Sequence, residues 1–419
     1  MKKILLFLCV TGLFGSVEAQ QRTCGTMTLQ QMLIQDPAYL NAYRQDSAAL
    51  EAAYLANPDG GAADRLLVTV PVVVHVVYNT TGQNITDAQV MTQITAMNKD
   101  YQNFNSDTTA MPGIFKSVHG NPKISFCLAH TDPNGNYTTG IEHVHTNTTS
   151  FSDQDGDLVK QSGTGAAGWN NNFYLNIWTC NLSGGLLGYS TFPTGGVNWH
   201  DGCVIAYDAF GVGGSATYPF NKGRTVTHEV GHWFALYHIW GDDGGACPGS
   251  GGADDGISDT PPQASEHYGC PSYPQSSCNN TSDMYMNYMD YTDDACMYMF
   301  TKGQATKMNT TLTVSRTTIL TSTKCNIPAG VEANELDILF SISPNPGNGL
   351  LHLYAEYPTY KNLTVEVYSM TGARVYQANL AMGGVEAQTI DLSNQPNGTY
   401  FVKVTDGKNY ISKKVLVQR

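Results

Sequence analysis

The spacing of apolar residues predicts a mixed α/β domain in the middle of the chain. Residues 66–78 form a dense, valine-rich run, which suits a strand buried on both faces. Two later apolar runs predict further strands, and two capping boxes followed by apolar residues at helical spacing predict helices. These segments are residues 123–129 and 173–180 for the strands, and the boxes are Thr86 with Gln89 and Thr301 with Gln304. The order strand, helix, strands, helix indicates one mixed domain from about residue 66 to residue 327.

The two ends of the chain have a different character. Residues 20–60 are polar and alanine-rich and end at the breaker cluster 57–61. Residues 329–336 read as a linker. A turn cluster at 342–349 then precedes short segments of alternating polarity, such as 363–368 and 400–404. Strands at this spacing predict a small all-β sandwich at the C-terminus.

The start of the chain predicts export. Lys2 and Lys3 precede a short apolar run at residues 4–14, and small residues at 17–19 suit signal-peptide cleavage. The run is too short for a mature transmembrane helix, and no other run approaches that length. The net charge of −13 argues against nucleic acid as a partner, because no basic stripe is present to neutralise phosphates.

A histidine motif at residues 228–238 predicts a zinc site. His228 and His232 lie one helical turn apart on one helix face, where both can reach a single metal. His238 supplies a third ligand if the helix stops after His232. Catalytic zinc has three protein ligands and one open position. Glu229 is then placed as the general base for a water molecule.

The same segment carries a family resemblance. His228–His238 resembles the extended zinc signature of the metzincin proteases, and Asn287–Tyr291 is similar to their Met-turn. Residues 22–26, 259–263 and 293–297 resemble, more narrowly, the pappalysin family in its ulilysin-like bacterial branch. The resemblance implies a metzincin-type catalytic domain, with an irregular C-terminal subdomain, that hydrolyses peptide bonds of proteins. One position departs from the pattern: Ala235 stands where the family has glycine in a left-handed turn, which should cost about 1 kcal/mol.

The resemblance also implies roles for residues around the metal. Tyr291 would help to stabilise the transition state, although a packed aromatic is the alternative. Met289 is a structural floor beneath the metal. Cys24 is predicted to fill the fourth zinc position in a latent precursor, as a cysteine switch. The alternative is an incidental or disulfide-paired cysteine.

Calcium and disulfides are further expectations from the resemblance. The acidic, irregular loop offers oxygen ligands of the kind that calcium takes, or it is a plain solvated loop. The candidate ligands are Asp242, Asp243, Asp254, Asp255, Ile257, Asp259 and Thr260. The implied disulfides are Cys247 with Cys278 and Cys270 with Cys296. The pairing of Cys127, Cys180, Cys203 and Cys325 stays open, and buried free thiols are possible for the strand cysteines.

Two acidic residues suggest a substrate preference. Asp293 and Asp294 follow the Met-turn, where metzincins build the pocket for the residue after the scissile bond. A carboxylate there favours a basic side chain, and solvated loop residues or calcium ligands are the alternative. Arg65 is the only Lys or Arg between Arg44 and Lys99. Self-processing at Asp64–Arg65 is therefore predicted, in a stretch open to cleavage.

The tail has a resemblance of its own. Residues 343–346, 367–372 and 398–404, with the final strand at 413–417, resemble the type IX secretion sorting domains of Bacteroidetes. This implies the type IX secretion machinery as a partner and a secreted or cell-surface protein. An adhesive or glycan-binding sandwich is the rival interpretation of the tail. For the whole chain, the alternative to an endopeptidase is a catalytically idle, zinc-stabilised adhesin.

Together these features divide the chain into five predicted parts. They are a signal peptide (1–19), a propeptide with the cysteine switch (20–65), the catalytic domain (66–327), a linker (328–337) and the sorting sandwich (338–419).

Overall fold

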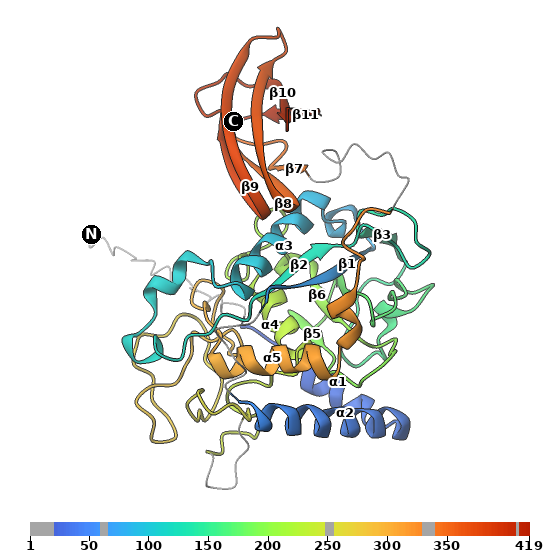
Figure 1. Cartoon of the computed structure of the whole chain (residues 1–419), viewed down its shortest axis with the longest axis vertical. Coiled ribbons are helices and arrows are strands. Elements are labelled where there is room, and N and C mark those ends of the chain that lie inside the picture. Colours follow the sequence, from blue (N-terminus) through green and yellow to red (C-terminus); the bar gives the residue numbers. More distant parts are fainter. Residues whose placement is uncertain (1–20, 59–65, 248–254, 329–339, 408–409) are drawn as a thin grey trace, which may run out of the picture.

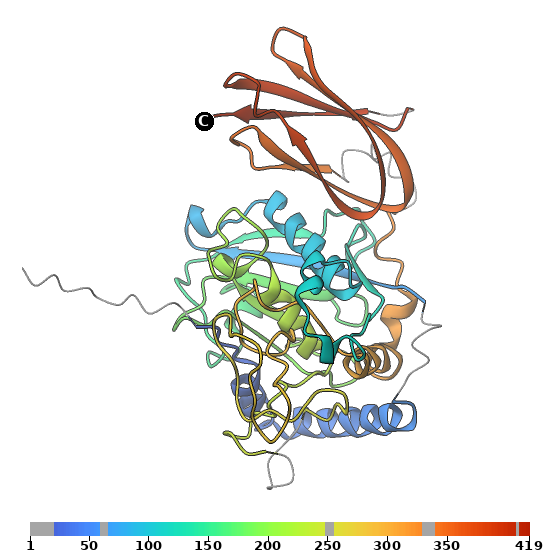
Figure 2. The same cartoon turned by 90° about the vertical axis from the view of Figure 1, so that its left-hand side faces the viewer.

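The computed structural model describes residues 21–58, 66–247, 255–328, 340–407 and 410–419. The predicted signal peptide, the cleavage site at Asp64–Arg65, Asp254 and nearly all of the linker lie outside the described residues. The predicted fold class is confirmed: a mixed α/β part precedes an all-β tail (Figures 1 and 2). Within the described residues, no helix is both long and apolar enough to cross a bilayer.

The N-terminal part contains six strands and five α-helices among the described residues. The strands are β1 (Val68–Tyr78), β2 (Ile124–Leu128), β3 (Ile141–His145), β4 (Leu175–Cys180), β5 (Gly188–Ser190) and β6 (Cys203–Ala206). The helices are α1 (Thr26–Leu33), α2 (Pro37–Ala56), α3 (Asp87–Tyr101), α4 (Arg224–Trp233) and α5 (Lys302–Val314). The helices α1 and α2 were not foreseen, because α1 has only eight residues and the apolar residues of α2 are few and scattered among alanines.

The strand β1 is the centre of a mixed sheet. It runs parallel to β2 and β3 on one side and to β4 on the other, and β6 extends the sheet in parallel beyond β4. The short strand β5 pairs antiparallel with β6 and forms an edge of the sheet. One face of β1, with Val70, Val72, Val74 and Val76, packs in the main core with residues of α3 and α4. This packing holds α4 against the sheet next to β5.

Local sequence explains where the main helices begin. The Thr86 hydroxyl accepts a hydrogen bond from the Gln89 amide at the start of α3. A complete capping box, Thr301 with Gln304, opens α5. The helix α2 starts at Pro37 with Asp36 as its N-cap, and it lies along α5 at the bottom of Figure 1.

The tail is a separate antiparallel structure with its own apolar core. Its strands are β7 (Phe340–Ser343), β8 (Leu350–Ser369), β9 (Arg374–Asp391), β10 (Gly398–Thr405) and β11 (Tyr410–Val417). The long strands β8 and β9 pair with each other and bend, as Figure 2 shows. The first part of β8 also pairs with β7 and the last part with β10, so two layers form from one continuous sheet.

Candidate metal centre

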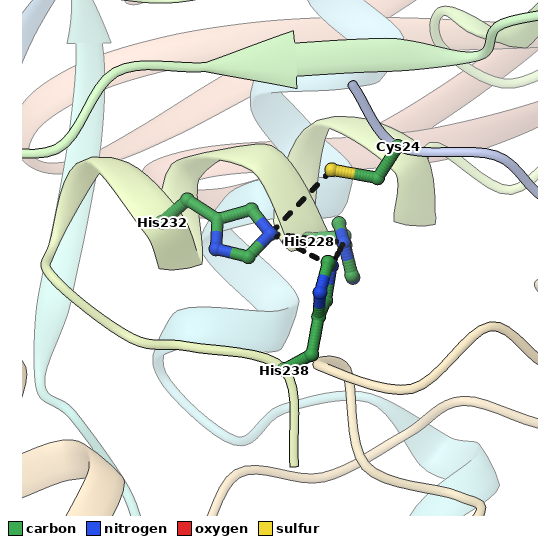
Figure 3. A group of neighbouring side chains, drawn as sticks. All are labelled: Cys24, His228, His232 and His238. Carbon is green, nitrogen blue, oxygen red and sulfur yellow. Dashed lines mark hydrogen bonds between the residues drawn. The ribbon is translucent and has the colours of Figure 1, made fainter. Parts of the chain in front are cut away.

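Three imidazoles converge on one point beside α4. His228 and His232 lie on the same face of this helix, and His238 reaches them after a turn (Figure 3). Their Nε2 atoms are 3.1–3.2 Å from one another. Three equal bonds of about 2.0–2.1 Å to a tetrahedral zinc ion would separate the nitrogens by roughly 3.3 Å. The spacing in the structure therefore fits a zinc ion held by the three residues.

The other ring nitrogens decide what the Nε2 atoms can do. The Nδ1 atoms of His228 and His232 each lie 2.7 Å from a backbone oxygen, those of Tyr288 and Leu236. The Nδ1 atom of His238 lies 2.7 Å from a carboxylate oxygen of Asp242. Because these partners only accept, each Nδ1 carries the proton and each Nε2 presents a lone pair. Three lone pairs at this distance repel one another unless a cation lies between them.

Cys24 approaches the same point from the N-terminal segment. Its Sγ atom is 3.5 Å from Nε2 of His232, and the four possible ligand atoms all lie within 4.8 Å of one another. Zinc–sulfur and zinc–nitrogen bonds of about 2.3 and 2.0–2.1 Å predict a separation of roughly 3.6 Å. Burial, followed by the charge of Glu229, raises the pKa of the thiol. A bound metal would act in the opposite direction.

The segment around Cys24 is held by an edge strand. Cys24 forms a parallel bridge with Gly188 of β5. The Gly25 amide donates to the Gly188 oxygen, and the Leu187 amide donates to the Thr23 oxygen. This pairing places the thiol over the histidines. The N-terminal segment therefore lies between β5 and the histidines of α4.

The turn between His232 and His238 has the strain that the sequence predicts. Ala235 has φ 65°, in the left-handed region. The Ala235 amide donates to the His232 oxygen, and the Leu236 amide donates to the Gly231 oxygen. The turn therefore ends α4 and presents the Leu236 carbonyl to His232. It also sends the chain back so that His238 reaches the metal position.

Glu229 is fully buried in this state of the molecule. Its Oε2 atom accepts a hydrogen bond from the Thr26 hydroxyl at 3.0 Å and lies 3.5 Å from the thiol of Cys24. Burial raises the pKa of Glu229 to about 8, although hydrogen bonds from Cys24 and Thr26 oppose the shift. A Cβ atom on Gly188 would lie 2.9 Å from Cγ of Glu229. Any larger residue at position 188 would therefore clash with the Glu229 side chain.

The predicted Met-turn lies beneath the histidines. Met289 is fully buried, and a Cβ atom on Gly231 would come within 2.4 Å of its sulfur. The glycine inside the histidine motif therefore allows the methionine to pack under α4. Tyr291 follows, with its ring centroid 4.9 Å from that of His238 and 5.7 Å from that of His228. Burial raises the pKa of its hydroxyl, and the charge of Cys24 adds to the shift.

Asp294 is completely buried and forms an ion pair with Arg22. The guanidinium Nη2 is 2.5 Å from its Oδ1 atom. Arg22 also donates to the Thr292 oxygen and the Thr225 hydroxyl, and it lies 4.9 Å from the centroid of Phe220. The other carboxylate oxygen of Asp294 accepts from the amides of Lys222 and Arg224 at the start of α4. Asp293 is only half-buried, and burial raises its pKa.

The candidate calcium ligands separate into several places. Thr260 donates to both Asp255 oxygens and to the Ile257 oxygen, so these three residues lie together. Asp259 instead accepts from the Gly303 amide. Asp242 contacts His238, a contact that would orient this imidazole as a zinc ligand.

The cysteines of the irregular segment pair as the resemblance implies. Cys247 is bonded to Cys278 and Cys270 to Cys296. The open pairing is resolved by a third disulfide, Cys127 with Cys325. Cys180 and Cys203 are buried free thiols in β4 and β6.

Some residues of the site were not found from the sequence. Trp240 stacks on His238, with ring centroids 4.4 Å apart and an interplanar angle of 4°. Thr26 contacts Glu229, and its hydroxyl also accepts from the Ser190 amide of β5. Thr26 lies two residues after Cys24, and Trp240 lies two residues after His238, which places both near the metal ligands. Spacing along the chain alone does not predict their contacts.

Comparisons with families of known proteins agree with this geometry. The family model described as Pregnancy-associated plasma protein-A matches residues 159–313. A second model, the secretion system C-terminal sorting domain, matches residues 341–418. An extracellular metalloprotease of Arthroderma benhamiae is 31% identical over 300 residues, which are 70% of this chain and 91% of that protein. One of Arthroderma otae is 29% identical over 311 residues, with 73% and 96% covered.

Two solved structures are also similar. Mature mirolysin of Tannerella forsythia, in complex with a cleaved peptide, is 48% identical with a TM-score of 0.57. The match covers 61% of this chain and 96% of that one. A mutant of promirolysin from the same organism is 42% identical with a TM-score of 0.63, and 72% and 97% of the two chains are covered.

Proposed function

Since the chain belongs to the pappalysin family of zinc metalloendopeptidases, we propose that its mature form cleaves proteins before arginine or lysine. In this proposal Asp294 binds the basic side chain that follows the scissile bond. The protein is a secreted or cell-surface metalloprotease of the zymogen type. The observation that carries the assignment of the site is the convergence of three Nε2 lone pairs beside Glu229. His228, His232 and His238 would hold the zinc ion.

Each residue has a defined task in peptide-bond hydrolysis. Bound zinc supplies Lewis-acid chemistry, which polarises the scissile carbonyl and lowers the pKa of a water molecule. Glu229 accepts the proton of the attacking water and passes it to the leaving amine. The Tyr291 hydroxyl stabilises the negative charge that develops on the carbonyl oxygen. Asp242 and Trp240 hold the His238 ring in its orientation.

Latency follows from the position of the N-terminal segment. Cys24 would hold the fourth ligand position of a bound zinc ion and would thereby keep the catalytic water away from Glu229. Thr26 engages the carboxylate itself. Removal of residues 20–64, by cleavage at Asp64–Arg65, would release all of these contacts at once.

The specificity proposal rests on the Arg22–Asp294 pair. Arg22 places a guanidinium against a fully buried carboxylate two residues from the thiol on the metal site. A pocket that holds this side chain in the precursor can hold the same side chain of a substrate after activation. Breaking a buried ion pair by removing one partner costs about 3–5 kcal/mol, so an empty pocket strongly favours a cation.

Hydrolysis of casein tests the enzymatic assignment. The mature enzyme should degrade casein, and both a zinc chelator and Glu229→Ala should abolish the activity. Casein cleavage by the Glu229→Ala variant would refute the role of Glu229 as the general base.

A peptide library tests the specificity. The mature enzyme should cut before Arg or Lys, and Asp294→Asn should lose most of this preference while still cutting before neutral residues. Asp293→Asn is the matched control and should keep the preference, because Asp293 is not the partner of Arg22. Apolar residues after the scissile bond in wild-type cleavage would refute the proposal.

The acidic loop supports calcium as a second metal. Asp243 and Asp259 each have a buried carboxylate oxygen without a hydrogen-bond partner, and calcium binds such oxygens. Calcium should raise the unfolding temperature of the zinc-loaded protein, and an unchanged temperature would count against calcium at either carboxylate.

The tail supports export by the type IX machinery and removal of the sorting domain after transit. The alternative of a catalytically idle, zinc-stabilised adhesin rests on Ala235 and the tail. In support of the endopeptidase, His238 reaches the other histidines despite the strained turn.

A further inference from the structure

The long helix α2 covers a pair of aromatic residues beside the metal centre. Tyr43 of this helix forms a hydrogen bond with Tyr237, with the two hydroxyl oxygens 2.7 Å apart. The Tyr43 ring lies 6.3 Å from that of Phe192, and Phe192 lies 4.8 Å from Tyr237. Phe192 and Tyr237 therefore form a surface, the aromatic pair, on which Tyr43 rests.

The aromatic pair and Asp294 lie on opposite sides of the metal position. Asp294 accepts hydrogen bonds from backbone amides at the start of α4. Phe192 packs edge-on against His232, near the end of the same helix, at 5.7 Å between centroids. Tyr237 belongs to the turn that follows α4. Cys24, over the three histidines, lies between these two places.

The course of the N-terminal segment connects the two places. Arg22 occupies the pocket of Asp294, Cys24 crosses the metal position, and the chain continues through α1 to α2. A substrate with its basic residue in the Asp294 pocket has the residues before the scissile bond on the other side of the metal. That side holds the aromatic pair.

We propose that Phe192 and Tyr237 form a subsite that binds an aromatic side chain of the substrate, preferably tyrosine, upstream of the scissile bond. The proposal rests on the proposed function. In the precursor, Tyr43 occupies this subsite, as Arg22 occupies the Asp294 pocket. Loss of residues 20–64 exposes both at the same time.

The chemistry of the subsite selects an aromatic ring over an aliphatic side chain. Phe192 and Tyr237 offer ring faces and edges at the tilted geometry in which aromatic groups attract one another. The Tyr237 hydroxyl loses its partner when Tyr43 leaves. A tyrosine in the substrate restores that hydrogen bond, whereas phenylalanine supplies only the ring.

Kinetics of the mature enzyme on short fluorogenic peptides tests the proposal. Each peptide has arginine after the scissile bond, and Tyr, Phe, Leu or Ala is placed in turn at each upstream position. At one upstream position, Tyr should raise kcat/KM about tenfold over Ala, with Phe between them, as expected for one aromatic contact and a hydrogen bond. The Tyr to Ala ratio should fall below about twofold in Tyr237→Ala.

A second variant and a control make the outcome specific. Tyr237→Phe should keep the preference for Phe over Ala and lose that for Tyr over Phe. Phe104→Ala, which removes an exposed ring just beyond α3, should keep the wild-type ratio. The proposal is overturned if no upstream position favours an aromatic residue, or if the ratio persists in Tyr237→Ala. Cleavage before Arg without that preference would leave the proposed function standing, whereas failure to cut any peptide would overturn both.

Discussion

Replacement of Arg22 by alanine should turn the latent precursor into one that activates itself rapidly. Arg22 and Asp294 have side chains only 1% and 0% exposed. The guanidinium donates to Asp294, Thr292 and Thr225. In Arg22→Ala the carboxylate keeps only the amides of Lys222 and Arg224 as partners while the segment is docked.

The magnitude follows from the burial of this pair. Breaking a buried ion pair costs about 3–5 kcal/mol, and water that enters the vacated pocket reduces the loss. A loss of about 3 kcal/mol corresponds to a shift of roughly a hundredfold in the equilibrium between docked and released segment. If release limits self-processing, the rate of activation should rise by a similar factor.

Purified precursors report this rate directly. Conversion to the mature size is followed by electrophoresis, together with cleavage of a fluorogenic peptide, at low protein concentration with zinc present. Arg44→Ala is the matched control, because it removes an exposed arginine from α2 of the same segment. Arg22→Lys should be intermediate, since lysine keeps the charge but not the three-acceptor geometry. Equal rates for Arg22→Ala and Arg44→Ala would refute the idea that this pair holds the segment in place.

Three further predictions concern the switch, the strained turn and pH. Cys24→Ala should give a precursor that is active or cleaves itself rapidly, and mature enzyme should begin at or near Arg65 by N-terminal sequencing. A stable, latent Cys24→Ala protein would refute the switch, and normal processing of pure Glu229→Ala precursor would refute self-cleavage. Ala235→Gly should raise the free energy of unfolding by roughly 0.5–1 kcal/mol in zinc-saturated protein, because Ala235 has φ 65°; chemical denaturation would show no gain if the turn is unstrained. Burial lowers the pKa of His267, but the hydrogen bond and charge of Asp290, with the charge of Asp283, outweigh it, so the pKa is raised above 6.5. The stabilisation of the fold by protonated His267 is then complete below about pH 6.5 and is lost as the pH rises through the folded-state pKa. The difference in unfolding free energy between wild type and His267→Gln should therefore shrink over that pH range. A difference that stays constant with pH would contradict this prediction.

Local periodicity was sufficient for the parts of the protein that neighbouring residues determine. The valine-rich strand, the capped helices and the face shared by His228 and His232 depend on repeats of two and 3.6 residues, which can be read directly. The left-handed backbone of Ala235 was expected from the resemblance, since the family has a glycine in a left-handed turn at this position. By contrast, α1 is only eight residues long and α2 has no strong apolar pattern, and their packing on the catalytic part stabilises them.

Contacts between distant segments were decided only by the tertiary structure. Arg22 and Asp294 are 272 positions apart, and their pairing depends on how the N-terminal segment crosses β5 and the start of α4. The Cys127–Cys325 disulfide spans 198 positions and was one of several possible pairings. Asp242 is a candidate calcium ligand by composition, and only the tertiary structure shows that the turn after His238 also brings it to that imidazole. Sequence therefore determined which chemical groups are available, while the fold determined which of them meet, because burial and chain crossing bring together side chains that spacing along the chain cannot relate.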